Sequence, residues 1–143
     1  MASTRNLYLL DANILAAVFL GRKGAVTLVD PWITNREEVT SILIYGEVIE
    51  YAMGFANYTS RQADLQALFQ VIHVYPVTYP VLEQYATLRR AMRKPHGPGL
   101  IGDMDTLIAA TALQHNLTLV TTDGDFTRVP DLQHLLLPLS AIK

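Results

Sequence analysis

The chain has 143 residues, half of them hydrophobic, which predicts one folded domain with a sizeable core. Its formal net charge of −2 does not fit a generally basic nucleic-acid binder, so contact with a polyanion would need a local basic patch. There is no cysteine, which excludes disulfides and thiolate zinc sites and is compatible with a cytoplasmic protein. Asp11 and Asn13 interrupt the N-terminal apolar run, so we expect neither a membrane span nor a secretion signal.

The N-terminal part of the chain alternates strand-like and helical segments. Residues 7–10 form a short apolar run typical of a buried strand, and a helical pattern follows over residues 14–20. A second strand is predicted over residues 39–42, with an amphipathic helix after it. Asp11 therefore lies at the carboxyl end of the first strand, and Glu47 lies in the early turns of the helix after the second.

The middle of the chain ends in a basic segment. Alternating apolar residues predict a half-buried strand over residues 71–77, and Pro80 opens the next helix. The end of this helix carries four cations: Arg89, Arg90, Arg93 and Lys94. Such a run is usually a solvated helix end whose charges suit the helix dipole, but it is also the local patch that a polyanion would need.

The stretch over residues 101–126 is the richest in candidate functional residues. A helix is predicted over residues 106–115 and a buried strand over residues 117–121. The stretch carries four aspartates: Asp103, Asp105, Asp123 and Asp125. Two of them lie near the start of the helix and two follow the strand. A last apolar run, residues 132–139, is expected to contain an edge strand.

This alternation predicts a three-layer α/β/α domain with a mostly parallel central sheet, spanning residues 1–143 as a single domain. In open sheets of this kind, ligands gather at the carboxyl ends of the strands. The acids from the two ends of the chain are therefore expected to meet at one edge of the sheet. Carboxylates that converge without counter-cations raise one another's pKa, which favours a hard divalent cation, with Mg²⁺ or Mn²⁺ as the natural candidates.

Four motifs, in this order along the chain, resemble those of PIN-domain ribonucleases, most closely the small VapC-type toxins. They are Leu9-Leu10-Asp11-Ala12-Asn13, Ser41 with Glu47-Val48, Asp105 with Ile108-Ala109-Ala110, and Leu119-Val120-Thr121 with Asp123 and Asp125-Phe126. The block from Asp105 to Phe126 is the specific part of the match. Ala12 departs from the family, which usually has Thr or Ser after the first aspartate, and Ile44 stands where Thr is frequent.

The resemblance implies a PIN-like fold and a magnesium- or manganese-dependent endoribonuclease, the toxin of a toxin–antitoxin pair. The catalytic, metal-binding site that it implies consists of Asp11, Glu47, Asp105 and Asp123. Asp125 would be a further metal ligand, and Asn13 and Thr121 match polar positions that support the ligands. The basic segment from Arg89 to Lys94 would guide RNA to this site. The implied partners are RNA, an antitoxin whose apolar segment approaches the metal pocket, and a second copy of the chain.

Two pairs of acids compete for one position each. Asp103 and Asp105 could serve as helix cap and ligand in either order, and the spacing to the Ile-Ala-Ala block favours Asp105 as the ligand. Glu47 competes with Glu50 on the same helix, and the spacing from Ser41 favours Glu47.

Asp11, Asp123 and Asp125 also have a purely structural interpretation, because aspartate is a preferred helix cap and a common turn residue. Two other functions stay open. One is a catalytically inactive PIN-like domain that binds RNA or protein. The other is a phosphate-accepting receiver-like domain, against which Asp11 stands alone where an acidic pair is expected.

Apolar side chains around the end of the Glu47 helix predict association between copies of the chain. They are Tyr51, Met53, Phe55, Tyr58, Leu65, Leu68 and Phe69. The alternative is that these side chains complete the core of the monomer.

Overall fold

The computed structural model describes residues 5–143. The strands are β1 (Tyr8–Leu10), β2 (Glu38–Ser41), β3 (His73–Tyr75), β4 (Thr118–Thr121) and β5 (His134–Leu136). The α-helices are α1 (Ala12–Phe19), α2 (Lys23–Thr34), α3 (Ile42–Met53), α4 (Tyr58–Val71), α5 (Tyr79–Met92) and α6 (Asp103–Gln114). Two short 3-10 helices follow, η1 (Gly124–Arg128) and η2 (Leu139–Ile142).

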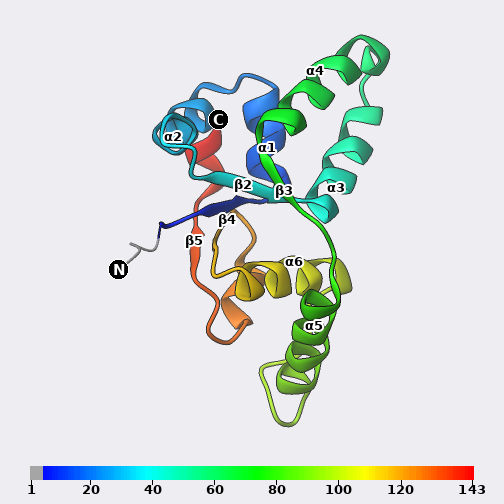
Figure 1. The fold of residues 1–143 in the computed structure, drawn as a ribbon, viewed down its shortest axis with the longest axis vertical. Helices are drawn as coiled ribbons and strands as arrows, with labels where there is room; N and C mark the ends of the chain where they lie inside the picture. Colours follow the sequence, from blue (N-terminus) through cyan, green and yellow to red (C-terminus); the bar gives the residue numbers. More distant parts are fainter. Residues whose placement is uncertain (1–4) are drawn as a thin grey trace.

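The five strands form one parallel sheet in the order β3-β2-β1-β4-β5. Helices cover both of its faces: α1 to α4 lie on one side and α5 and α6 on the other (Figure 1). The predicted three-layer α/β/α architecture with a mostly parallel sheet is therefore confirmed, and β5 is the expected edge strand.

The central strand β1 lies where the order of the strands reverses. It pairs with β2 on one side, where Leu9 faces Val39, and with β4 on the other, where Leu10 faces Val120. The chain first builds the sheet outward from β1 to β3 and then returns to the opposite side of β1 as β4. Connections leaving β1 and β4 therefore diverge, and the carboxyl edge between these two strands is the usual ligand site of such sheets.

Buried side chains on both faces of the central strands hold this edge in place. Leu9, Leu10, Leu119 and Val120 are at most 1% exposed, as expected for parallel strands covered by helices on both faces. Phe126 of η1 is also fully buried and is the largest such side chain. Its burial fixes the short segment after β4 against the core.

Two predicted features of the elements are wrong. The strand expected over residues 71–77 is limited to β3, because Val71 is still the last residue of α4 and its side chain is exposed. Asp103 does not cap α6. The N-cap is Gly102, and both Asp103 and Asp105 lie in the first helical turn, where negative charge suits the helix dipole.

The apolar residues expected to promote association differ in burial: Tyr58 and Leu68 are partly buried against the core, and Phe55 is half-buried. Leu65 and Phe69 belong to the core, so the alternative interpretation holds for them. Tyr51 and Met53 on α3 are 46% and 59% exposed and remain available to a partner. Within residues 5–143 no single helix could span a membrane; α1 and α2 have the required length and composition only as a pair, which is bent by 104°.

Candidate metal centre

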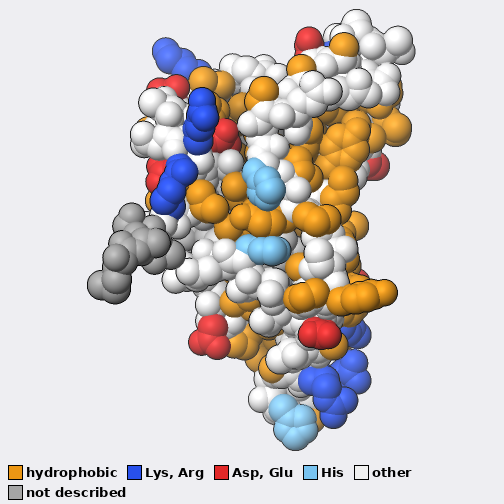
Figure 2. All heavy atoms as spheres, in the orientation of Figure 1, with side chains coloured by type: hydrophobic (Ala, Val, Ile, Leu, Met, Phe, Trp, Pro, Cys, Tyr) orange, Lys and Arg blue, Asp and Glu red, His pale blue; other side chains and the backbone are white. Residues whose placement is uncertain are grey.

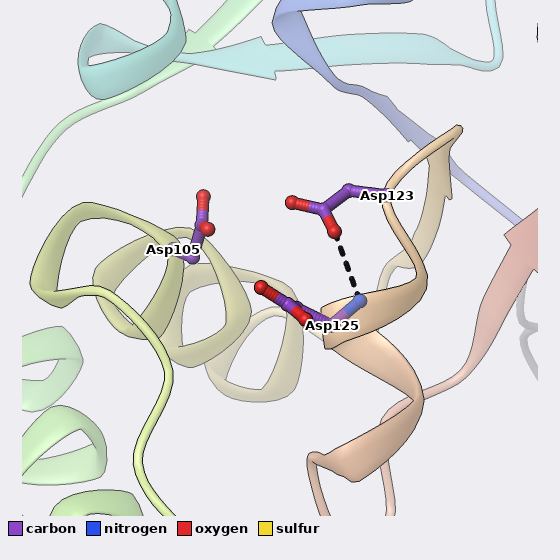
Figure 3. Close-up of side chains that lie close together, drawn as sticks. All are labelled: Asp105, Asp123 and Asp125. Atoms are coloured by element: carbon purple, nitrogen blue, oxygen red, sulfur yellow. Dashed lines mark hydrogen bonds between the residues drawn. The ribbon is translucent and has the colours of Figure 1, made fainter.

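Three carboxylates meet at the carboxyl edge of the sheet. Oxygen atoms of Asp105, Asp123 and Asp125 all lie within 4.8 Å of one another. Asp105 projects from the first turn of α6 toward Asp123 and Asp125, which come from the segment after β4 (Figure 3). The aspartates before the predicted helix and after the predicted strand therefore come together in space.

Asp123 has a structural role as well as a place in this cluster. It is the N-cap of η1, and its Oδ1 accepts a hydrogen bond of 2.9 Å from the backbone N–H of Asp125. A carboxylate has two oxygens with several lone pairs, so one side chain can cap a helix and still face a ligand. The turn-residue interpretation and the ligand interpretation of Asp123 are thus compatible.

One buried hydroxyl joins the ends of β1 and β4. Thr121 Oγ1 donates to Oδ2 of Asp11 at 2.7 Å and accepts the backbone N–H of Asp123 at 3.0 Å. Asp11 itself caps α1, because its Oδ1 accepts the N–H of Ala12 at 2.9 Å. The side chain of Asp11 is therefore held at both oxygens, beside the cluster.

Glu47 completes the acidic edge from α3. Its Oε1 is buried and has no hydrogen-bond partner. Burial, and then the negative charges of Asp11 and Asp105, raise the pKa of Glu47 to about 7.

The pKa of Asp105 is raised to about 6, by burial first and then by neighbouring negative charges, of which Asp123 is the strongest. Burial also raises the pKa of Asp11, although hydrogen bonds from Thr121 and Ala12 oppose the shift. All of these shifts arise because carboxylates are crowded where water is excluded.

These residues fit a hard divalent cation. The donors are carboxylate oxygens, which Mg²⁺ and Mn²⁺ prefer, and a cation between them would relieve the repulsion that raises their pKa values. The unpartnered Oε1 of Glu47 offers a further oxygen. Within residues 5–143 the one cluster of three or more potential ligands contains no histidine, which disfavours zinc and copper.

The structure distinguishes between the two acids that compete for each position. Glu47 interacts electrostatically with Asp11 and Asp105, whereas the side chain of Glu50 is exposed. Asp103 lies outside the cluster and forms an ion pair with Arg89. Of each pair, the residue favoured by spacing is therefore the one that the structure places at the site.

Asn13 lies beside the site without contacting an acid through a hydrogen bond. Its side-chain amide donates to Oγ1 of Thr122 at 3.1 Å and is exposed. This contact links the start of α1 to the end of β4. The predicted supporting role of Asn13 would thus act through the backbone that carries Asp123.

One of the four cations in the predicted basic segment, Arg89, is already engaged by other side chains. Arg89 pairs with Asp103 and lies over the ring of Tyr85, with 5.7 Å between the guanidinium carbon and the ring centroid. The hydroxyl of Tyr85 also donates to Asp103, at 3.2 Å, so this trio joins α5 to α6. The remaining cations are exposed: Arg90, Arg93 and Lys94. Lys and Arg side chains gather over this end of α5 at the bottom of Figure 2.

The sequence analysis missed Arg128. Its Nη2 donates to Oδ1 of Asp125 at 3.1 Å, which makes Arg128 the cation in direct contact with the acidic cluster. The available signal was the spacing of three residues between Asp125 and Arg128, which places two side chains on one face of a helical turn.

An apolar groove of about 720 Å³ runs between α1 and α3 and is bounded by η2. Its lining includes Ala16, Ala17, Leu20, Val48, Tyr51, Leu139 and Ile142. Asn13 and Glu47 also line it, so the groove reaches the acidic edge of the sheet. The sequence did not predict the groove, because it depends on the packing of residues after β5 beside the first helix.

The fold and the site define an α/β protein with a carboxylate cluster at the switch point of a parallel sheet. The PIN domain profile matches residues 8–132. The chain therefore belongs to the PIN domain family.

Two curated relatives align over most of the chain. One is Ribonuclease VapC19 of Mycobacterium tuberculosis, 31% identical over 126 residues that cover 87% of this chain and 96% of the relative. The other is Ribonuclease VapC1 of Haemophilus influenzae, 29% identical over 129 residues that cover 89% and 95%.

Solved structures show the same fold. A chain of VapBC2 from Rickettsia felis, bound to a DNA fragment from their promoter, matches with a TM-score of 0.80 and 21% identity, covering 92% of this chain and 98% of that one. A chain of VapBC-1 from nontypeable Haemophilus influenzae matches with a TM-score of 0.71 and 26% identity, covering 91% and 97%.

Proposed function

We propose that this protein is a divalent-metal-dependent endoribonuclease that hydrolyses RNA phosphodiesters, and that it is the toxin of a toxin–antitoxin pair. The observation that carries the proposal is the meeting of Asp105, Asp123 and Asp125 at the switch point of the sheet, beside Asp11 and Glu47. Similarity to VapC ribonucleases over almost the whole chain supports the same activity.

Asp105, Asp123 and Asp125 would hold the metal, together with Asp11 and Glu47. A divalent cation in such a site lowers the pKa of water and stabilises negative charge on the phosphate and the leaving oxygen. Thr121 orients Asp11 for this task through its 2.7 Å hydrogen bond. Glu47 and Asp105 must lose protons before they bind a cation, because their pKa values are raised to about 7 and about 6. We expect RNA products with 5′-phosphate and 3′-hydroxyl ends.

The acidic site repels the phosphate backbone that it cleaves, so cations must offset this repulsion. The exposed residues Arg90, Arg93 and Lys94 can do so, whereas Arg89 already pairs with Asp103. An RNA substrate and the absence of cysteine fit a cytoplasmic location.

We propose the groove between α1 and α3 as the binding site of the antitoxin. Its lining is mostly apolar, and it borders Glu47, so an apolar segment bound there could place a cationic side chain at the acids. The similarity to VapBC structures supports an antitoxin as the partner. The cation of the partner would then take the place of the metal charge and inhibit cleavage.

The experiment compares wild type, Asp11→Asn and Asp30→Asn in cleavage of RNA with Mg²⁺ or Mn²⁺. Asp30 is an exposed acid on α2 and serves as the matched control. We expect cleavage by wild type and Asp30→Asn, and none by Asp11→Asn or in excess EDTA. Circular dichroism should show an intact fold in Asp11→Asn, since asparagine also caps helices.

Undiminished cleavage by Asp11→Asn, or by wild type in EDTA, would disprove the proposed site. Binding of RNA without cleavage under all metal conditions would favour the alternative, an inactive PIN-like domain that binds RNA or protein.

A further inference from the structure

Arg128 presents two different nitrogens to its surroundings. Nη2 donates to Oδ1 of Asp125 at 3.1 Å, which places the guanidinium beside the acidic cluster. Nη1 points instead toward Gly99, where it lies 3.7 Å from the position that a Cβ of this residue would occupy. The side chain is 38% exposed and can be reached by a ligand.

Lys94 approaches the same point. Its Cε lies 3.4 Å from the Cβ position of Gly99, so Lys94 and Arg128 flank one backbone position in the loop between α5 and α6. Gly99 has φ +111, a conformation that favours glycine, and its N–H donates to the carbonyl of Met92 at 2.7 Å. The loop is therefore held in a conformation in which the aliphatic part of the Lys94 side chain packs over Gly99.

Lys94 and Arg128 each keep at least one nitrogen outside the ion pairs of the described residues. Within residues 5–143 the ion pairs are Arg89–Asp103 and Arg128–Asp125, so Lys94 is unpaired. Two neighbouring cations repel each other unless an anion lies between them. Arg128 is ion-paired, as Arg89 is, but Arg89 also lies over the ring of Tyr85 in the contact between α5 and α6.

We propose that Nη1 of Arg128 and Nζ of Lys94 form a subsite for one phosphodiester of the RNA backbone, next to the carboxylate cluster. The inference rests on the proposed ribonuclease function and names the residues that position its substrate. Arg128 is a positioning residue with two contacts: it holds Asp125 with one nitrogen and the phosphate with the other. The subsite thereby fixes the distance between the RNA backbone and the metal ligands.

The test measures binding of a labelled single-stranded RNA to the full chain by fluorescence anisotropy, across a series of KCl concentrations at fixed Mg²⁺. All proteins carry Asp11→Asn, so that the RNA is not cleaved. The variants are Lys94→Ala, Arg128→Gln and the double variant, with Arg128→Lys as the conservative replacement. Lys23→Ala is the matched control, because Lys23 is an exposed cation on α2, outside the basic segment.

We expect each of the two single variants to lower the slope of log affinity against log salt by about 0.7, and the double variant by about 1.4. Arg128→Lys should keep most of the slope, and Lys23→Ala should keep all of it. Titration with Mn²⁺, followed by the thermal shift of the protein, should show metal binding that is unchanged or tighter in Arg128→Gln, because a cation has been removed from Asp125.

An unchanged slope in the double variant, with RNA still bound by the parent, would overturn this inference and leave the proposed function standing. A slope lowered equally by Lys23→Ala would overturn it as well, in favour of diffuse attraction by the surface cations in general. If the parent binds no RNA and the chain with Asp11 restored cleaves none, the proposed function fails and the subsite with it.

Discussion

Thr121 and Thr40 are both fully buried threonines on strands next to β1, but only the hydroxyl of Thr121 is hydrogen-bonded. The Thr121 hydroxyl serves Asp11 and the N–H of Asp123, whereas Oγ1 of Thr40 has no hydrogen-bond partner. Valine has nearly the shape of threonine, so the same substitution isolates the hydroxyl at both positions.

Thr121→Val should lower the free energy of unfolding by about 1–3 kcal/mol, because it leaves a buried N–H and a carboxylate oxygen unpaired. Affinity for Mn²⁺ should fall about 10- to 100-fold, as is usual when a group that orients a ligand is lost. Urea unfolding and metal titration measure the two effects. Unchanged metal affinity would mean that Thr121 does not orient Asp11.

Thr40→Val should instead raise the free energy of unfolding by about 1 kcal/mol, since it removes a buried polar atom that has no partner. The same urea titration measures it. A loss of stability as large as that of Thr121→Val would show that the effect comes from the change of shape and not from the hydroxyl.

The raised pKa of Glu47 predicts how the stability of the metal-free protein depends on pH. Its pKa is about 7 in the folded chain, above the ordinary value of 4.5, so between these values the folded chain binds more protons than the unfolded chain. The free energy of unfolding should therefore fall as pH rises from about 4.5 to about 7. Urea unfolding in EDTA across this range should show the decline.

Glu47→Gln should flatten most of this decline, and Glu50→Gln, an exposed acid on the same helix, should leave it unchanged. The part that remains in Glu47→Gln belongs to Asp105, whose pKa is raised from 3.8 to about 6, and to Asp11, whose pKa is also raised by burial. Stability that rises with pH in the absence of metal would contradict the assignment.

The acids of the site could be predicted from the sequence because each one stands directly beside an element with a clear pattern. Asp11 and Asp123 follow apolar strands, and Asp105 lies in the first turn of a helix. Arg128 could not be predicted in the same way, because its role depends on Gly99 and on a loop that reaches η1 from a distant part of the sequence.

At the scale of elements, the parallel sheet was predictable because its central strands are continuous apolar runs. The ends of the helices were harder to predict. Helix α4 extends to Val71, although the alternating pattern of side chains from this residue onward suggested a strand. The groove also escaped prediction, because the packing of η2 against α2 joins segments at opposite ends of the chain.

Gly24 determines how closely η2 can approach α2. Its N–H donates to the carbonyl of Lys143 at 2.7 Å, and an added Cβ would lie 2.5 Å from that oxygen. Gly24→Ala must therefore displace the segment that bounds the groove and should cost about 1–3 kcal/mol in the free energy of unfolding. Binding of the antitoxin should weaken while RNA cleavage persists, as measured by calorimetry and gel assay.

Gly46→Ala is the matched control. Gly46 lies within α3 with no atom within 4 Å of its Cβ position, so the substitution should stabilise the protein by about 0.5–1 kcal/mol. Equal stability of the two variants would show that the contact between α2 and residues 139–143 is not tight.

At the scale of the whole molecule, we predict a homodimer that uses the exposed apolar surface of α3. Light scattering should give a dimer mass at concentrations on the order of tens of micromolar, as mass action requires for a weak dimer. Met53→Asp should shift the mass toward the monomer, whereas Val71→Asp, which places the same charge at an exposed position on α4, should not. A wild-type monomer mass across the whole series would exclude the dimer.

The hydrogen bond between Thr121 and Asp11 joins residues that are 110 positions apart in the chain. Because a ribosome makes the chain from its N-terminus, Asp11 exists long before β4, Asp123 and Asp125 do. At roughly 5 to 20 residues per second, this interval lasts about 5 to 20 s. A nascent chain therefore carries no assembled acidic centre until β4 and the segment that follows it have been made.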